Sequence, residues 1–322
     1  DIELEATPER FIDDAWVRGD FDKRLAEVHV EVGGRIGKGT GLRVSIDGEA
    51  VELRLGQSNG SGNPNVLKVP LRDFRAWSPE HPNLYWTKIE LLKDGQVVQV
   101  RKERFGVRKL EARGKEFYLN GKRFFFRGFG DDGSYPIAGV TPPSRQFHLE
   151  HMKKARACGF NYVRLHSHCE TPEYFEAADE AGIMIQPELS YYLDDPDDYF
   201  DYDPVRDAAD RWIAFRRYPS YAISSSGNEG LLGPGAGRIL YGLLKELDPD
   251  RLVIEQDMGS AEAENNNLPQ EGRSDFVGGP LNTWRRGSFN PDKPFVCHEY
   301  MNLCVKQDSR TESLYKGVWQ AP

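Results

Sequence analysis

The chain has 322 residues and a mass of 36.6 kDa, and its 42 Lys and Arg against 51 Asp and Glu leave a formal net charge of −9. This length corresponds to about two domains, and 39% hydrophobic residues exclude a disordered or collagen-like chain. No apolar run reaches the roughly 18 residues of a membrane-spanning helix, which excludes an integral membrane protein. The acidic balance disfavours a nucleic-acid partner, because phosphate binding needs a concentrated basic face.

The cysteines and the first residues say little about the compartment. Cys158, Cys169, Cys297 and Cys304 have spacings that fit neither a dense disulfide framework nor a CxxC metal site. The sequence begins at Asp1 without a basic and then apolar leader, so we expect a signal peptide to be absent or already removed.

Residues 1–108 have the period-two pattern of half-buried strands. The apolar members of three such runs are Ala26, Val28, Val30 and Val32, then Leu42, Val44 and Ile46, then Val51, Leu53 and Leu55. Turn sequences separate the strands, and Asp47-Gly48 and Asp94-Gly95 favour tight hairpins. Short strands without a helical pattern predict an all-β, immunoglobulin-like sandwich.

From 109 to 322, short apolar runs alternate with segments of helical period, which is typical of βα units and a parallel sheet. The seven predicted strands are Arg123–Arg127, Asn161–His166, Ile183–Glu188, Ala222–Gly227, Leu252–Asp257, Asp275–Val277 and Phe295–Glu299. Helix signals lie between them: Thr171 as N-cap with Pro172 after it and Gly182 at the end, and an apolar stripe from Ile239 to Leu247. We therefore predict an α/β (β/α)8 TIM barrel that holds strands one to seven and lacks its last βα unit.

Polar residues at the carboxyl ends of barrel strands converge on one pocket. The predicted strand ends hold Asp131 and Asp132, Arg164, His166 and His168, Glu188, Asn228 and Glu229, Asp257, and His298 and Glu299. Glu229 and Glu299 form the kind of carboxylate pair that glycoside hydrolysis requires: one protonates the leaving oxygen, and the other attacks or activates water at the anomeric carbon. A single glutamate at a strand end is more often a rim carboxylate in a salt bridge, so spacing alone does not decide the role of either residue.

The segment Arg217–Glu229 resembles the acid/base signature of glycoside hydrolase family 2, which reads NHPS, three apolar residues and W-S-x-G-N-E. The match is ungapped and ends in Gly227-Asn228-Glu229, but Ser224 stands where the family has Trp. Losing that Trp would reshape the pocket.

Three further stretches resemble the same family and occur in the right order. Trp77–Tyr85 is similar to the WSPENPxLY segment of its immunoglobulin-like domain, and Phe105–Arg108 to the FGFR that closes this domain. Phe117–Lys122 with Arg127-Gly128 resembles the start of its catalytic barrel. The resemblance covers nearly the whole chain and implies an enzyme like the β-galactosidases and β-glucuronidases.

The resemblance also implies the catalytic roles. Pro294–Tyr300 is similar to the segment that carries the family's nucleophile, which assigns Glu299 as nucleophile and Glu229 as acid/base of a retaining double displacement. Asn228 would then hydrogen-bond the sugar 2-hydroxyl. Arg164 lies in a segment similar to the family's NxxRxxH strand and would hold the nucleophile ionised. A barrel-interior ion pair fits Arg164 equally well.

The remaining candidates for contacts with the sugar are His166, His168, Glu188, Asp257, His298, Tyr300 and Trp284. A loop Trp is packed about as often as it stacks on a sugar. The implied partner is an oligosaccharide or polysaccharide-derived glycoside, with no cofactor and no metal, and an extracellular or periplasmic setting is favoured because polysaccharides are usually degraded there. A β-galactosidase-like exo activity is preferred, although the sugar does not follow from these residues.

Two alternatives stay open. His166-x-His168 at a strand end is also how a metal-dependent hydrolase can begin its metal site, although further histidine ligands are missing between His168 and His298. A carbohydrate-binding protein that has lost turnover would share the fold, although both glutamates are present.

Overall fold

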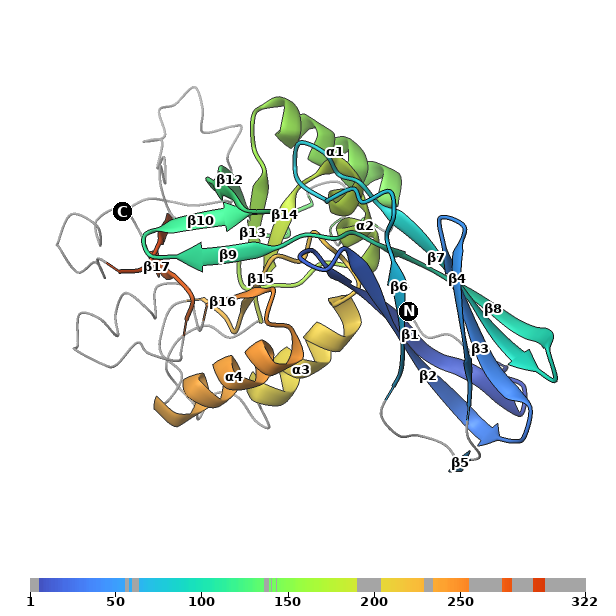
Figure 1. Cartoon of the computed structure of the whole chain (residues 1–322). Coiled ribbons are helices and arrows are strands. Elements are labelled where there is room, and N and C mark those ends of the chain that lie inside the picture. Colours follow the sequence, from blue (N-terminus) through green and yellow to red (C-terminus); the bar gives the residue numbers. More distant parts are fainter. Residues whose placement is uncertain are drawn as a thin grey trace, which may run out of the picture.

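The computed structural model describes residues 6–55, 58–59, 64–135, 139, 141–142, 144–189, 204–228, 234–254, 274–279 and 292–298. The described part consists of a β-sandwich and a part built from parallel strands and helices, which lie side by side (Figure 1). Within these ranges, no helix is both long and apolar enough to span a bilayer.

Two antiparallel sheets form the sandwich around a shared apolar core. The first sheet contains β1 (Arg10–Asp20), β2 (Leu25–Ile36) and β6 (Asn65–Pro70), with the short β5 (Ser58–Asn59) at the end of β2. The second sheet has the order β4 (Glu49–Arg54), β3 (Thr40–Ile46), β7 (Tyr85–Lys93) and β8 (Gln96–Phe105).

The period-two pattern determines which side chains fill this core. Val28 and Val30 of β2 are completely buried, as the alternation predicts, whereas Leu53 of the edge strand β4 is 36% exposed. The prediction that β4 is half-buried is therefore only partly right, because β4 is the outermost strand of its sheet and has a neighbouring strand on one side only. Asp47 and Asp94 have positive φ angles of 47° and 49°, and each is followed by glycine in a two-residue hairpin.

The second part begins with an antiparallel sheet of β9 (Leu110–Arg113), β10 (Glu116–Leu119) and β11 (Lys122–Phe124). Its parallel strands are β12 (Gly128–Asp131), β13 (Tyr162–Leu165), β14 (Met184–Pro187), β15 (Ile223–Ser225), β16 (Leu252–Ile254), β17 (Val277–Gly279) and β18 (Phe295–Cys297). The helices are α1 (Arg145–Ala157), α2 (Pro172–Ala181), α3 (Pro204–Phe215) and α4 (Pro234–Leu247).

The parallel strands follow one another in chain order. β12, β13 and β14 form one parallel sheet, and single bridges from Ile185 to Tyr221 and from Glu188 to Ser225 extend it to β15. β15 then pairs with β16, and β17 pairs with β18. In Figure 1, α1 and α2 lie on one side of these strands, and α3 and α4 lie on the other. This is the arrangement expected of βα units, and closure into an eight-stranded barrel stays a prediction.

The first parallel strand differs from the prediction. Residues 123–127 were expected to form it, but Lys122–Phe124 belong to the antiparallel β11 and the first parallel strand is Gly128–Asp131. The reason is the turn Asn120-Gly121, whose φ angles of 53° and 77° fold the chain back onto β10. The apolar stripe of α4 is also narrower than predicted, because Leu240 and Leu244 are buried whereas Ile239 is 62% exposed.

Buried contacts connect the sandwich with the second part. The fully buried Trp77 donates its ring N–H to the Asp179 carbonyl oxygen at 2.8 Å. Arg108, at the end of the sandwich, donates from Nε to the Pro219 carbonyl at 2.6 Å and from Nη2 to the Tyr221 carbonyl at 2.6 Å. The two parts therefore share a hydrogen-bonded interface.

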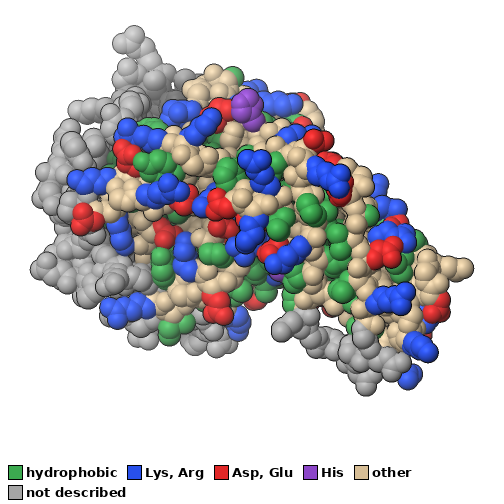
Figure 2. All heavy atoms as spheres, in the orientation of Figure 1, with side chains coloured by type: hydrophobic (Ala, Val, Ile, Leu, Met, Phe, Trp, Pro, Cys, Tyr) green, Lys and Arg blue, Asp and Glu red, His purple; other side chains and the backbone are tan. Residues whose placement is uncertain are grey.

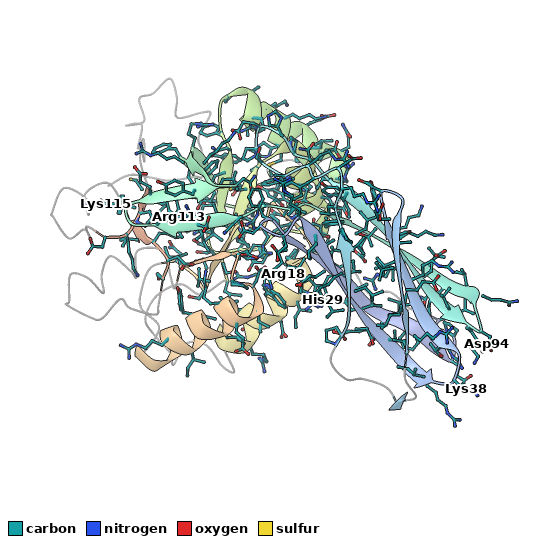
Figure 3. The ribbon with its side chains drawn as sticks, in the orientation of Figure 1. Arg18, His29, Lys38, Asp94, Arg113 and Lys115 are labelled. Carbon is teal, nitrogen blue, oxygen red and sulfur yellow. The ribbon has the colours of Figure 1, made fainter. Side chains whose placement is uncertain are left out.

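The surface carries both signs of charge. Figure 2 shows Lys and Arg side chains interspersed with Asp and Glu on the face that it presents. Figure 3 places Lys38 and Asp94 at the far end of the sandwich, and Arg18 and His29 close to its junction with the helices.

Candidate active site

Arg164 lies at the centre of a buried polar cluster at the carboxyl ends of β13, β14 and β15. Its side chain is 5% exposed and forms a two-point ion pair with Glu188, with Nε 2.6 Å from Oε1 and Nη2 3.2 Å from Oε2. Nη2 also donates to Oδ1 of Asn228. A planar guanidinium can donate to the Glu188 carboxylate and to the Asn228 amide oxygen at once. Arg164 of β13 therefore connects the segments that follow β14 and β15.

Glu188 is completely buried, and several donors compensate its charge. Besides Arg164, the backbone N–H of Ser167 donates to Oε2 at 2.8 Å and Nε2 of Gln186 donates to Oε1 at 3.2 Å. Tyr162 in turn donates to Oε1 of Gln186 at 2.7 Å, which orients the amide. The sequence proposed Glu188 as a contact for the sugar, whereas these bonds suit a residue that holds Arg164 in place.

Asn228 carries a buried donor with no partner among the described residues. Its side chain is completely buried, its Oδ1 accepts from Arg164, and its Nδ2 has no hydrogen bond within the described ranges. A buried donor left unsatisfied costs about 1–3 kcal/mol, so a ligand oxygen placed there would be bound favourably. Asn228 directly precedes Glu229, one of the two predicted catalytic carboxylates.

Arg211 of α3 holds the strand ends beside Asn228. It donates from Nη1 to the Pro187 carbonyl at 3.2 Å and from Nη2 to the Ser225 carbonyl, and it is 6% exposed. The Ser225 hydroxyl donates to the Gly227 carbonyl at 3.1 Å. These bonds connect the segment that leads to Asn228 with the end of β14.

A second charged pair lies on the segment after β13. Nε2 of His168 is 3.5 Å from Oε1 of the buried Glu170, which also accepts from the Tyr135 hydroxyl at 2.8 Å. Burial lowers the pKa of His168, but Glu170 and the His166 carbonyl raise this pKa to a net value above the usual one. Burial raises the pKa of Glu170, but its interactions with His168, Tyr135 and Thr141 lower this pKa overall. The arrangement favours an imidazolium beside a carboxylate.

We predict that the imidazole of His168 titrates with a midpoint above 6.5 in the folded chain, and that Glu170→Gln lowers this midpoint. Because the pKa of His168 is raised in the folded chain, its protonation stabilises the fold. This stabilisation is fully present below pH 6.5 and is lost as the pH rises through the midpoint of the folded chain. NMR titration of the imidazole protons measures both midpoints, with Glu150→Gln on the exposed face of α1 as control. Equal midpoints in the parent chain and in Glu170→Gln would contradict the pairing.

The structure describes only some of the other predicted site residues. His166 has a side chain that is 34% exposed, and its Nδ1 is 3.9 Å from Oδ1 of Asp132. His298 is half-buried directly after β18. Glu229, Asp257, Trp284, Glu299 and Tyr300 lie outside the described residues. In the part of the chain that is described, no three His, Cys, Asp or Glu side chains are grouped so that they could hold a metal ion.

The sequence analysis missed Gln186 and Glu170. Gln186 pairs with Arg164 across β13 and β14, and residues two apart on a strand point to the same face. The spacing of Gln186 and Glu188 could therefore have placed both beside Arg164. Glu170 had a weaker signal, since it directly precedes the helix cap at Thr171 in an otherwise polar loop.

Comparison with known proteins identifies relatives. Residues 10–108 match the family model described as Glycosyl hydrolases family 2. The β-galactosidase large subunit of Latilactobacillus sakei is 23% identical over 333 residues, covering 94% of this chain and 51% of that protein. The β-galactosidase of Oenococcus oeni is 27% identical over 284 residues, covering 79% of this chain and 27% of that protein. The chain thus spans about half or less of the length of these curated relatives.

A solved structure shares the fold over most of the chain. The family 2 β-galacturonidase of Eisenbergiella tayi, bound to glycerol, superimposes with a TM-score of 0.73 at 18% identity, covering 90% of this chain and 56% of the other. At this identity the likeness concerns the multi-domain, β-rich fold.

Proposed function

We propose that this chain, whose residues 10–108 match the model of glycosyl hydrolases family 2, is a member of that family and forms the sandwich and catalytic parts of a β-glycosidase. The observation that carries the proposal is the buried Nδ2 of Asn228, which has no partner among the described residues and belongs to an amide that Arg164 orients immediately before Glu229. An oriented donor beside a general acid suits a sugar hydroxyl next to the bond that is cleaved.

The proposed reaction is a double displacement that retains the anomeric configuration. Glu299 attacks the anomeric carbon while Glu229 protonates the departing oxygen, and Glu229 then deprotonates the water that releases the sugar. Retention needs the two carboxyl groups about 5–5.5 Å apart. The negative charge of Glu299 raises the pKa of Glu229, and the neutral glycosyl ester lowers it again, which suits the change from acid to base.

In this mechanism Asn228 binds the sugar 2-hydroxyl, where the hydrogen bond strengthens in the transition state. Arg164 keeps the amide oriented, and Glu188 keeps Arg164 in place. Arg164 is also proposed to stabilise the charge of Glu299, since both belong to strands that end at the same edge of a barrel. His166, His168, His298, Asp257, Tyr300 and Trp284 are the proposed contacts for the other hydroxyls.

The proposed architecture is an immunoglobulin-like sandwich over 1–108 and a (β/α)8 barrel over 109–322, completed by an eighth strand. The order of β12 to β18 along the chain supports it, as does the fold shared with the solved family 2 structure. Active sites of such barrels lie at the carboxyl ends of the strands, which is where Arg164 and Asn228 lie.

The substrate class follows from the relatives. The two curated relatives compared above are named β-galactosidases, another that covers 60% of this chain is named a putative β-glucuronidase, and one solved structure that shares the fold is a β-galacturonidase. We therefore propose an exo-acting enzyme on terminal β-linked hexoses or hexuronic acids, with β-galactosides as the first choice.

The test is hydrolysis of chromogenic β-galactoside, β-galacturonide, β-glucuronide, β-glucoside and β-mannoside by the complete product of the gene, with and without chelator. Proton NMR identifies the anomer released first, and Glu229→Gln and Glu299→Gln serve as inactive controls. We expect release from one or two of these substrates, a β-anomer first, and no effect of chelator. Binding of sugar without release would indicate a carbohydrate-binding protein, and loss of activity with chelator would indicate a metal-dependent hydrolase.

A further inference from the structure

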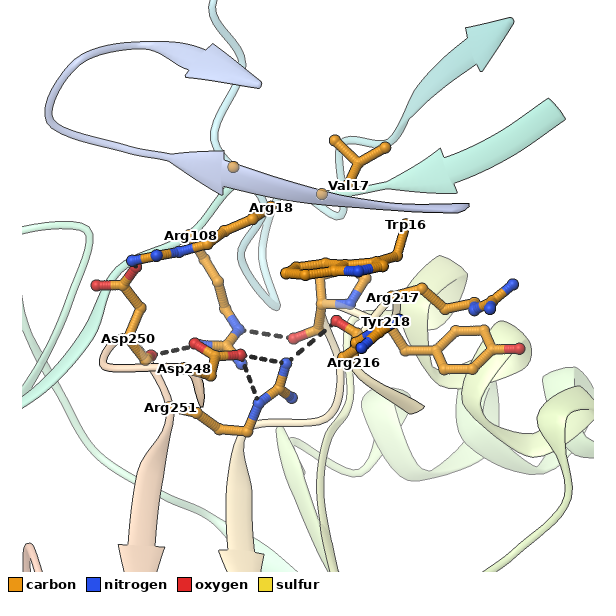
Figure 4. A pocket seen from close by; sticks show the side chains of 13 residues that line it. Trp16, Val17, Arg18, Arg108, Arg216, Arg217, Tyr218, Asp248, Asp250 and Arg251 are labelled. Atoms are coloured by element: carbon orange, nitrogen blue, oxygen red, sulfur yellow. Dashed lines mark hydrogen bonds and ion pairs between the residues drawn. The ribbon is translucent and has the colours of Figure 1, made fainter. Parts of the chain in front are cut away.

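A small pocket lies between the sandwich and the second part, away from the candidate active site. It is bounded by β1, by the end of β8 and by the segments that lead into β15 and β16 (Figure 4). Its volume is about 50 Å³, and since a water needs roughly 10–15 Å³ on this measure, it has room for about four waters or one small tetrahedral ion.

Guanidinium groups dominate the lining. Among the described lining residues, the charged ones are five arginines and two aspartates: Arg18, Arg108, Arg216, Arg217, Arg251, Asp248 and Asp250. The arginines come from both parts of the molecule, and Figure 4 shows the Arg108 and Arg251 side chains meeting in the space below β1, whereas the Arg217 side chain points away from it. Four of these arginines pair with carboxylates: Arg18 with Asp250, Arg251 with Asp248, Arg216 with Asp14, and Arg217 with Asp14 and Glu103. Five arginines therefore stand against four carboxylates, and the positive charge that is left beside a small space favours an anion.

Among the described residues, Arg108 touches no carboxylate. Arg108 is 8% exposed and donates only to the carbonyl oxygens of Pro219, Tyr221 and Asp250, at 2.6, 2.6 and 3.3 Å. Burial, and after it the neighbouring Arg251, lower the pKa of Arg108 to about 10 although nearby aspartates raise it. An anion beside it would restore the balance of charge.

Three donors of the lining are also unused. The Nε–H groups of Arg18, Arg216 and Arg217 are buried and have no hydrogen-bond partner among the described residues. The side chain of Arg216 is only 8% exposed, because its guanidinium stacks on Trp16 at 4.5 Å and pairs with Asp14 at 2.6 Å. Buried donors without partners are rare and costly, and an oxyanion in the pocket offers the kind of acceptor that such donors lack.

We propose that this pocket binds one inorganic oxyanion, phosphate or sulfate, which bridges the sandwich and the second part. The pocket adjoins Pro219 and Asp250, which precede β15 and β16, whereas Asn228 follows β15. The ion therefore lies toward the opposite ends of the strands from the candidate active site. It stabilises the interface and takes no part in the chemistry, so the inference does not depend on the proposed activity.

The test is isothermal titration calorimetry of the purified chain with inorganic phosphate and sulfate at constant ionic strength, together with thermal unfolding. We expect one saturable site per chain and a midpoint of unfolding that rises by a few degrees at about 100 times the dissociation constant. Chloride at the same ionic strength produces neither effect. Glycerol phosphate binds more weakly than phosphate because the pocket is small.

Arg18→Gln and Arg43→Gln form a matched pair of variants. Their side chains are 33% and 34% exposed, and each pairs with a carboxylate, but Arg43 lies in the other sheet. We expect Arg18→Gln to weaken phosphate binding by about tenfold or more, and Arg43→Gln to change it less than about twofold. Circular dichroism shows whether both variants remain folded.

Three results would overturn the proposal. They are the absence of saturable heat with either oxyanion, an equal loss of binding in the two variants, and crystals grown with selenate that show no anomalous peak in the pocket. Equal or tighter binding of glycerol phosphate would overturn its assignment to an inorganic ion.

Discussion

Arg164→Ala is expected to lower the free energy of unfolding by about 3–5 kcal/mol, because it leaves the completely buried carboxylate of Glu188 without its two-point partner. The Ser167 amide and Gln186 still donate to the carboxylate, but neither carries a charge. Asn228 loses its orienting bond at the same time, so hydrolysis of the preferred glycoside should fall as well. Chemical denaturation and initial rates measure the two effects.

Arg145→Ala is the matched control for this prediction. Arg145 pairs with Glu176 and Glu180, but these side chains are 37% to 41% exposed. Ion pairs of this kind contribute about 0–1 kcal/mol, so this variant should remain close to the parent chain in stability. Arg164→Lys keeps the charge but cannot serve Glu188 and Asn228 together, and it should fall between the two. A loss below about 1 kcal/mol for Arg164→Ala would contradict the buried ion pair.

Trp77→Ala is expected to destabilise the chain by about 3–5 kcal/mol. The Trp77 side chain is completely buried in a cluster with Tyr162 and Ile223 of the second part, and its ring N–H is bonded to the Asp179 carbonyl. Alanine leaves a cavity at the interface and an unsatisfied carbonyl oxygen. Because the Trp77 side chain contacts both parts, the two parts should unfold in one transition in the parent chain. In the variant, unfolding should occur at a lower denaturant concentration.

Trp86→Ala tests whether position or residue type matters. Trp86 lies on β7 of the same sandwich, but it is 61% exposed. Its removal should change the stability by less than about 0.5 kcal/mol, since surface substitutions away from special features are usually nearly neutral. Equal losses for Trp77→Ala and Trp86→Ala, or separate unfolding transitions for the two parts of the parent chain, would show that Trp77 does not couple them.

Much of the local structure could be predicted because it depends on short-range rules. The alternation at Val28 and Val30 identified the buried face of β2, and the two Asp-Gly hairpins formed where they were predicted. The signals at Pro172 and Gly182 marked the ends of α2. The wrong prediction of a parallel strand at residues 123–127 also has a local cause, since parallel and antiparallel strands can contain the same apolar run.

The partners of buried polar groups could not be predicted in this way. Arg164 bonds to Glu188 and Asn228, which lie 24 and 64 positions further along the chain. The sequence pattern does not indicate which distant residues a buried arginine will contact. The roles of Glu229 and Glu299 stay predictions from the resemblance, because both residues lie outside the described ranges.

The sequence by itself determined several strands of the sandwich and the βα order of the second part, because periodicity and turn chemistry are local properties. Only the tertiary structure decided that Glu188 pairs with Arg164, that Nδ2 of Asn228 has no partner among the described residues, and that arginines from both parts line one pocket. These features depend on which distant segments of the chain pack together and so exclude water from the groups between them. Burial then decides whether a polar group needs a partner, and how strongly two charges interact.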